Sequence, residues 1–255
     1  GGSFNVGTDT NLSLSIRGDG TATIEKLVLN ANAGTFTVNI EDLNSHLILQ
    51  DASAIVLGDG GTMRLIGGDD DAGQITIGSM GALNLGSNGT LDLSDYEVLG
   101  TTPGLTASLA TDNAATVTLG TAEQDFDLAG TGTFTFEVNG AGNGLVEIDG
   151  FDAGAGAGAG AEVLDFSTFN WNVDFANADG AGTVNSFNTL MEGLDNSGDS
   201  WTLFDNTGAD ALLTFTRTGD DVVITDAGNG NFSGNITLVG VADQLTEDNF
   251  AFNVV

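Results

Sequence analysis

The chain has 255 residues, of which 36 are acidic and 4 basic, so its formal net charge is −32. A surface this negative repels phosphate backbones and anionic lipid headgroups, which argues against nucleic-acid binding and electrostatic docking on membranes. The same charge makes divalent cations the expected partners. Because 40% of the residues are hydrophobic, we expect the chain to fold. The chain has no cysteine, which excludes disulfides and thiolate chemistry.

Two further features of the sequence bear on where the protein is located. No segment reaches the roughly 18 consecutive apolar residues of a membrane-spanning helix, so no membrane insertion is expected. The first residues, Gly1 to Phe4, include neither a methionine nor a basic stretch, and we expect a processed chain or a fragment.

Residues 1–140 alternate apolar and polar side chains with a period of two, as half-buried β-strands do. Clear examples are Leu12–Ile16, Phe36–Ile40 and Phe134–Val138, and glycine, asparagine or aspartate follows each within a few residues. The pattern predicts an all-β fold of short strands joined by tight turns.

A repeat of eight residues lies between positions 46 and 97. Apolar strand starts fall at Leu47, Ile55 and Met63, and then, after an acidic insertion, at Ile75, Leu83 and Leu91. Three such units, about 24 residues, suit one coil of a three-sided β-helix, and two suit a flattened β-roll. We therefore expect residues 1–140 to form a β-solenoid of one of these kinds. A β-sandwich is the alternative, because strand spacing is irregular between residues 98 and 140.

Residues 141–255 form the second predicted region, which is β-rich with a bulkier aromatic core. An uninterrupted Ala–Gly alternation at 153–161 is interpreted as a linker, with a silk-like strand as the alternative. Apolar spacing over Phe187–Leu194 predicts one short helix. Strands are predicted at residues 201–204, 211–217, 222–225 and 235–239.

Four phrases in this region carry a family resemblance. Residues 145–152 read LVEIDGFD and residues 162–169 read EVLDFSTF, and GDDVVIT at 219–225 and NITLVGV at 235–241 follow in order. Together they resemble the C-terminal part of RTX-type proteins, which bacteria export by type I secretion. The resemblance implies a calcium-binding β-roll, an uncleaved C-terminal secretion signal and a Gram-negative host. Two features depart from the family: no strict glycine-rich nonapeptide occurs, and the Ala–Gly run replaces a linker that is usually short and acidic.

Calcium is the cofactor that the acidic clusters predict, because it takes six to eight oxygen ligands. The alternative is that aspartate, asparagine and glycine occupy these positions for turn geometry. The candidate metal ligands are Asp69, Asp70, Asp71, Asp149, Asp152, Asp199, Asp220, Asp221 and Asp226.

Catalytic residue types are scarce, and we expect no enzyme and no catalytic residues. His46 is the only histidine, so a Ser-His-Asp site would depend on it, and a solvent-facing or edge position is the simpler interpretation. Zinc is disfavoured for the same reason. A β-helical polysaccharide lyase would need a basic residue as its base, and Arg64 is better explained by an outward ion pair. The basic residues available are Arg17, Lys26, Arg64 and Arg217.

The leading functional hypothesis is a secreted structural protein that assembles outside a Gram-negative cell, as a surface-layer or matrix-filament subunit. A solenoid offers strand edges that pair with further copies into a homo-oligomer or polymer. Divalent ions would relieve repulsion between subunits. The alternative is a module that binds extracellular glycan through Trp171 or Trp201, although core packing also explains both tryptophans.

Overall fold

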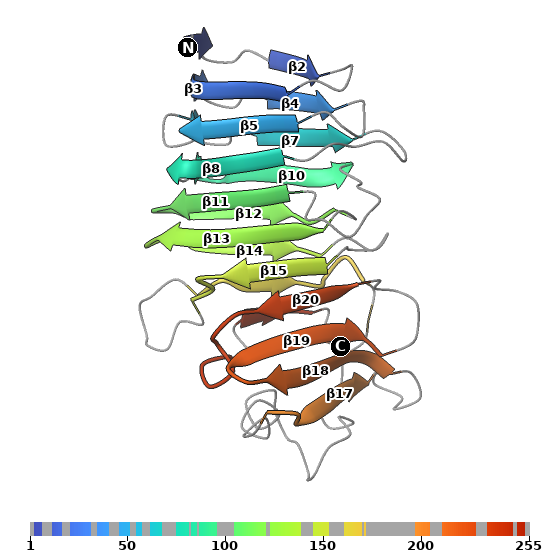
Figure 1. The fold of residues 1–255 in the computed structure, drawn as a ribbon. Helices are drawn as coiled ribbons and strands as arrows, with labels where there is room; N and C mark the ends of the chain where they lie inside the picture. The colour runs from blue at the N-terminus through green and yellow to red at the C-terminus, as the bar shows by residue number, and fades with distance from the viewer. Residues whose placement is uncertain are drawn as a thin grey trace. The chain divides into compact units, whose positions relative to one another are not determined.

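The structure is a computed structural model, and within its described residues the regular elements are 21 β-strands, which confirms the predicted all-β class (Figure 1). Among those residues, no helix is long and apolar enough to cross a membrane. The structure describes residues 3–6, 12–16, 21–31, 35–40, 46–51, 55–57, 62–67, 75–81, 83–85, 87–95, 105–120, 123–138, 145–152, 161–169, 171, 197–204, 211–227, 234–246 and 249–252.

The chain divides into two compact units, residues 1–135 and residues 136–255. The boundary falls inside β14 (Thr133–Glu137), a few residues before the predicted division at residue 140. The predicted helix over Phe187–Leu194 and most of the Ala–Gly run lie outside the described residues.

Unit 1 contains two sheets, and successive parts of the chain alternate between them. One sheet contains β1 (Ser3–Val6), β3 (Thr21–Ala31), β5 (His46–Asp51), β6 (Ile55–Leu57), β8 (Ile75–Gly81), β9 (Leu83–Leu85), β11 (Leu105–Thr111) and β13 (Gln124–Gly130). The other contains β2 (Leu12–Ile16), β4 (Thr35–Ile40), β7 (Thr62–Gly67), β10 (Gly89–Asp95), β12 (Ala114–Thr118) and β14.

The eight-residue repeat in the sequence corresponds to strands that pair in register. Leu47 of β5 pairs with Ile75 of β8, Leu57 of β6 with Leu85 of β9, and Met63 of β7 with Leu91 of β10. In each case the partner lies 28 residues further along the chain. Three repeats therefore make one circuit of the two sheets, and the acidic insertion lengthens that circuit beyond 24 residues.

The irregular spacing after residue 98 does not interrupt this pairing. β11 and β13 pair in parallel over their full length, from Leu105 with Gln124 to Thr111 with Gly130. β10 and β12 also pair in parallel. A β-sandwich is built from antiparallel sheets, so parallel pairing here argues against that alternative.

The core of unit 1 follows from the alternation of side chains along each strand. Met63, Leu91 and Val117 are fully buried and occupy paired positions on β7, β10 and β12. Phe126 and Phe134 are the bulkiest fully buried side chains among the described residues of the unit. Each such side chain contributes roughly 1.5–3 kcal/mol through removal of apolar surface from water.

Consecutive turns of unit 1 are in direct backbone contact. Gly132, between β13 and β14, donates its N–H to the Thr111 carbonyl at 2.9 Å, and Thr133 donates to the Asn113 carbonyl at 2.7 Å. The Thr111 hydroxyl in turn donates to the Leu85 carbonyl, also at 2.7 Å. Successive turns are therefore hydrogen-bonded to one another, as are the strands that they connect.

Unit 2 has a mixed sheet in the order β17-β18-β19-β20-β15. β20 (Asn235–Leu238) pairs in parallel with β15 (Leu145–Asp149). The other pairings are antiparallel and join β17 (Ser200–Phe204), β18 (Ala211–Thr218), β19 (Asp221–Asp226) and β20. The four strands predicted after residue 200 are thus confirmed.

Aromatic side chains fill the core of unit 2, as the composition predicts. β16 (Val163–Asp165) pairs in parallel with β21 (Phe250–Ala251). The ring of Phe166, which follows β16, is fully buried and lies 6.3 Å from Phe169, 6.1 Å from Trp171 and 5.4 Å from Phe252, measured between ring centroids.

Candidate functional site

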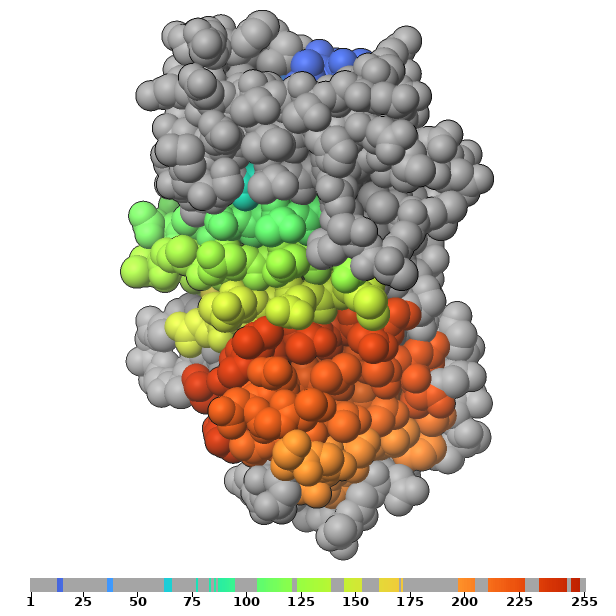
Figure 2. Space-filling model, in the orientation of Figure 1, coloured from blue at the N-terminus to red at the C-terminus, as the bar shows by residue number. Residues whose placement is uncertain are grey.

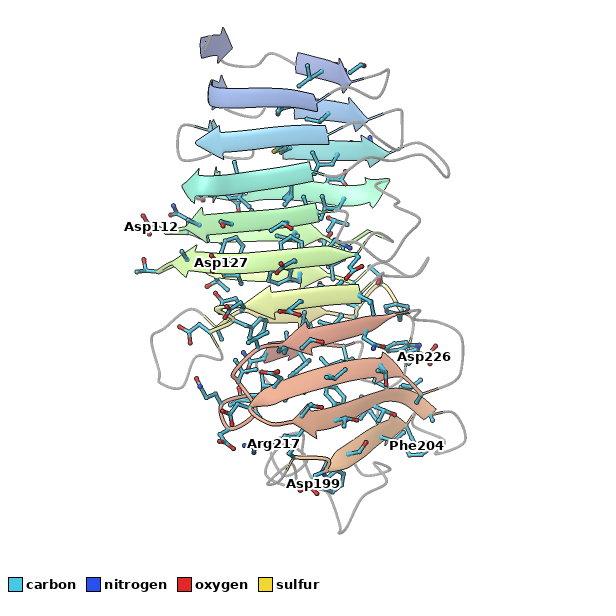
Figure 3. The ribbon with its side chains drawn as sticks, in the orientation of Figure 1. Asp112, Asp127, Asp199, Phe204, Arg217 and Asp226 are labelled. Atoms are coloured by element: carbon cyan, nitrogen blue, oxygen red, sulfur yellow. The ribbon has the colours of Figure 1, made fainter. Side chains whose placement is uncertain are left out.

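Acidic residues from separate parts of the sequence meet at one end of the antiparallel strands of unit 2. The turn at Ser197–Asp199 precedes β17, the turn at Gly219–Asp220 joins β18 to β19, and residues 239–244 follow β20. Figure 3 places Arg217 and Asp199 at this end of the strands, and Phe204 and Asp226 at the other. We call this end, formed by residues 197–199, 217–221 and 239–244, the acidic turn cluster.

Hydrogen bonds join the three segments of the acidic turn cluster. Ser197 accepts a hydrogen bond at its hydroxyl from the Gly219 N–H at 2.9 Å. The Asp221 carboxylate accepts one from the Gly240 N–H, also at 2.9 Å. Gly219 has a φ of 69° and open space where a Cβ would lie, so this turn needs glycine for its left-handed backbone.

Arg217 is the positive charge of the cluster and is only 8% exposed. Its Nη1 lies 2.6 Å from Asp243 Oδ1, its Nε donates to the Gly219 carbonyl at 2.9 Å, and its Nη2 lies 3.8 Å from Asp220 Oδ1. The hydrogen bonds from Arg217, and then its charge, hold the pKa of Asp243 below its ordinary value. Through these contacts the Arg217 side chain joins the turn between β18 and β19 to the segment that follows β20.

A second group of acids lies around the ends of the Ala–Gly run. Asp149 ends β15, and both it and Asp152 are exposed, whereas Glu162 is only 5% exposed. Asp152 donates its N–H to the Glu162 carboxylate and accepts the Glu162 N–H at 3.0 Å. The buried Asn249 side chain donates to the Glu162 carbonyl, also at 3.0 Å. The contacts between Asp152 and Glu162 therefore join the residues that flank the Ala–Gly run.

Glu162 is the buried carboxyl of this group. Burial raises its pKa from the ordinary 4.5 to about 7, and the negative charge of Asp152 adds to the rise, while backbone hydrogen bonds oppose it. The folded chain therefore holds this proton more tightly than the unfolded chain. Stability is greatest where both states are protonated and is lost as the pH rises from about 4.5 to about 7.

We expect Glu162→Gln to raise stability at pH 8 and to leave it nearly unchanged at pH 4. The amide carbonyl still accepts from the Asp152 N–H, while the charge whose burial costs about 2 kcal/mol, after allowance for partial solvation, is removed. Urea midpoints across this pH range measure the difference. Asp149→Asn removes an exposed charge nearby and is the matched control; equal gains in both variants would show that net charge alone acts.

Six of the nine predicted calcium ligands lie among the described residues, at three places. Asp199, Asp220 and Asp221 belong to the acidic turn cluster, and Asp149 and Asp152 lie with Glu162. Asp226 ends β19, half-buried and paired with Leu213 on β18. The remaining three, Asp69, Asp70 and Asp71, lie outside the described residues. Over the part of the chain that the structure describes, no three acidic or histidine side chains are grouped so as to hold a metal ion.

Several other sequence interpretations can be compared with the structure. Arg64 lies 3.7 Å from Asp92 on the neighbouring strand, which confirms the predicted outward ion pair. His46 begins β5, which pairs with both β3 and β8, so it does not lie on an edge strand. Trp171 and Trp201 are 7% and 6% exposed, which confirms core packing and leaves neither indole open as a platform for a sugar ring.

Sequence reasoning missed Asp243 and Glu162. Asp243 stands outside every acidic run and contacts Arg217, 26 residues earlier. Glu162 adjoins the Ala–Gly run, yet nothing in its spacing indicates burial.

Comparison of the chain with protein-family models, with curated proteins and with solved structures gives no match.

Proposed function

We propose that this chain is a secreted structural protein that assembles with further copies of itself outside a Gram-negative cell, with calcium as the stabilising ion. The proposal includes no catalytic activity. Its extracellular, type I-secreted character is supported by the RTX-like phrases of residues 145–169 and 219–241. Its structural character is supported by the arrangement of strands and charges.

We propose further that unit 1 is a flattened, two-sided β-solenoid, in which each circuit takes three repeats and not the two expected of a β-roll. Successive parts of the chain alternate between two sheets, and all the pairings described within the unit are parallel. In three of these pairings, the paired residues lie 24 to 30 positions apart in the sequence. Each circuit then contacts chiefly its two neighbours, as in other repeat architectures.

The observation that carries the assembly proposal is the pairing of the terminal strands. Among the described strands, β2 pairs only with β4, and β17 pairs only with β18. A strand paired on one side presents a row of backbone N–H and C=O groups that another chain can use. An assembly through such edges needs no site beyond the sheets themselves.

Charge explains why assembly would depend on calcium. Copies carrying a net charge of −32 repel one another until counterions neutralise them. The acidic turn cluster contains four aspartates and one arginine, Arg217, and two exposed aspartates, Asp149 and Asp152, lie beside the buried Glu162. Calcium sites in extracellular modules are weak, with dissociation constants of about 10⁻⁴ to 10⁻³ M, so millimolar calcium is the concentration at which such acids would be neutralised.

We expect millimolar calcium to produce large assemblies and EDTA to dissolve them. Light scattering and negative-stain electron micrographs of the same samples measure both steps. Sodium chloride at equal ionic strength is the control, because it screens charge without bridging carboxylates. A monodisperse monomer at millimolar calcium, or scattering that EDTA leaves unchanged, would contradict the proposal.

A further inference from the structure

Strand β17 lies at the edge of its sheet, and its sequence lacks the features that usually keep an edge strand from pairing with another chain. It pairs antiparallel with β18 and, among the described strands, with no other. Its sequence, Ser-Trp-Thr-Leu-Phe, has no charged residue and no proline, the two devices by which edge strands usually avoid pairing with another chain. Figure 2 shows the outer face of β17 to β19 at the surface.

The direction of the backbone groups on β17 follows from its pairing. Arg217 donates its N–H to the Asp199 carbonyl at 2.9 Å, so residue 199 is bonded to β18. Antiparallel strands alternate bonded and non-bonded positions. Trp201 and Leu203 therefore continue the bonding to β18, while the N–H and C=O groups of Ser200 and Thr202 point to the outer edge.

The side chains of β17 alternate in the same way. Trp201 and Leu203 are buried in the core, whereas Ser200 is exposed and Thr202 half-buried on the outer face. The Thr202 hydroxyl lies 3.2 Å from that of Thr214, its partner on β18. Odd-numbered residues thus face the core, and even-numbered residues face outward and supply the outer-edge backbone groups.

We propose that β17 pairs with β17 of a second copy, antiparallel and centred on Thr202. This register places Thr202 opposite itself and Trp201 opposite Leu203, so both sheets keep their core faces on the same side. The outward backbone groups of the two Thr202 residues then bond reciprocally. Such a self-complementary contact has two-fold symmetry, the commonest arrangement in homo-oligomers.

The charge of the molecule favours a second copy as the occupant. Copies that repel through their acidic turns can approach most closely along an uncharged strand, where backbone bonds need no side-chain complement. The inference deepens the proposed self-assembly and rests on it. It assigns one contact of the assembly to residues 200–204.

Cysteine cross-linking tests this register, because the natural chain has no cysteine. Directly opposed residues of a bonded antiparallel pair have Cα atoms about 5.5 Å apart, within the range of a disulfide. With calcium and a mild oxidant, we expect Thr202→Cys to give a disulfide dimer at least about tenfold more abundantly than Thr216→Cys. Thr216 lies on the outer face of the inner strand β18 and is the matched control.

The outcomes separate this inference from the proposed function. Both variants are first shown to fold by the wild-type emission of their buried tryptophans. Calcium-dependent scattering without a preferential Thr202→Cys dimer overturns the β17 contact and leaves self-assembly standing. If neither calcium-dependent scattering nor a cross-linked dimer is observed, both the β17 contact and the proposed self-assembly are overturned. A second variant, Thr202→Pro, removes the outward N–H and should abolish the contact, whereas Thr202→Ala should retain it.

Discussion

Replacement of Gly132 by alanine is expected to destabilise unit 1 by about 3 kcal/mol or more, a large effect for one methyl group. A Cβ at this position would lie 2.1 Å from the Asn113 carbonyl oxygen and 2.4 Å from the Asn113 nitrogen. Both are backbone atoms of the preceding turn, which is itself hydrogen-bonded to residues 131–133. No side chain can rotate to make room, so the two turns must separate and lose these bonds.

Gly219→Ala is the informative comparison. Its Cβ would meet nothing within 4 Å, so only the left-handed backbone is strained. That conformation costs a non-glycine residue roughly 1–2 kcal/mol. Thermal melts followed by far-ultraviolet circular dichroism compare the two variants. Equal shifts for both would contradict the close stacking of turns in unit 1.

Phe166→Ala is expected to destabilise unit 2 by about 3–5 kcal/mol, the usual loss for a buried phenylalanine. The ring is fully buried and contacts three other aromatic rings, so its removal leaves a cavity that rigid neighbours cannot fill. Both tryptophans of the chain, Trp171 and Trp201, belong to unit 2. Urea unfolding followed by tryptophan emission therefore reports this unit directly.

Leu145→Ala is the control for Phe166→Ala. Leu145 begins β15 of the same unit but is 51% exposed, and its truncation should change stability by less than about 0.5 kcal/mol. A Phe166→Ala midpoint that is no lower than that of Leu145→Ala would show that the aromatic cluster contributes little. A loss of stability between that of Leu145→Ala and the expected loss of about 3–5 kcal/mol would indicate that the neighbouring rings move into the space left by Phe166.

The sequence predicts the strands of this protein better than its contacts. Repeats at Leu47 and Ile75 mark strands that pair in register, because a period-two pattern and a fixed step together determine which residues share a face and a level. The aromatic shift after residue 161 likewise predicts the bulky core of unit 2. Both signals are local or strictly periodic.

Contacts that close over long distances leave no such signal. Asn249 bonds Glu162 from 87 residues away, and Asp243 reaches Arg217 only after two hairpin turns bring them together. Turn chemistry accounts equally well for Gly132 and Gly219 in the sequence. Only the stacked backbone of Asn113 distinguishes a glycine that leaves no room for a methyl group from one that does.

The register of the parallel strands determines which insertions and deletions unit 1 can accept. Strands β3, β5 and β8 lie side by side in one sheet, with β5 bonded to the strands one circuit before and one circuit after it. Loss or duplication of one complete circuit would leave equivalent faces opposed, and every remaining inward side chain would still meet an inward neighbour. In the proposed β-solenoid, addition of a whole circuit would therefore preserve the register, whereas insertion of a single residue within a strand would turn its apolar side chains outward.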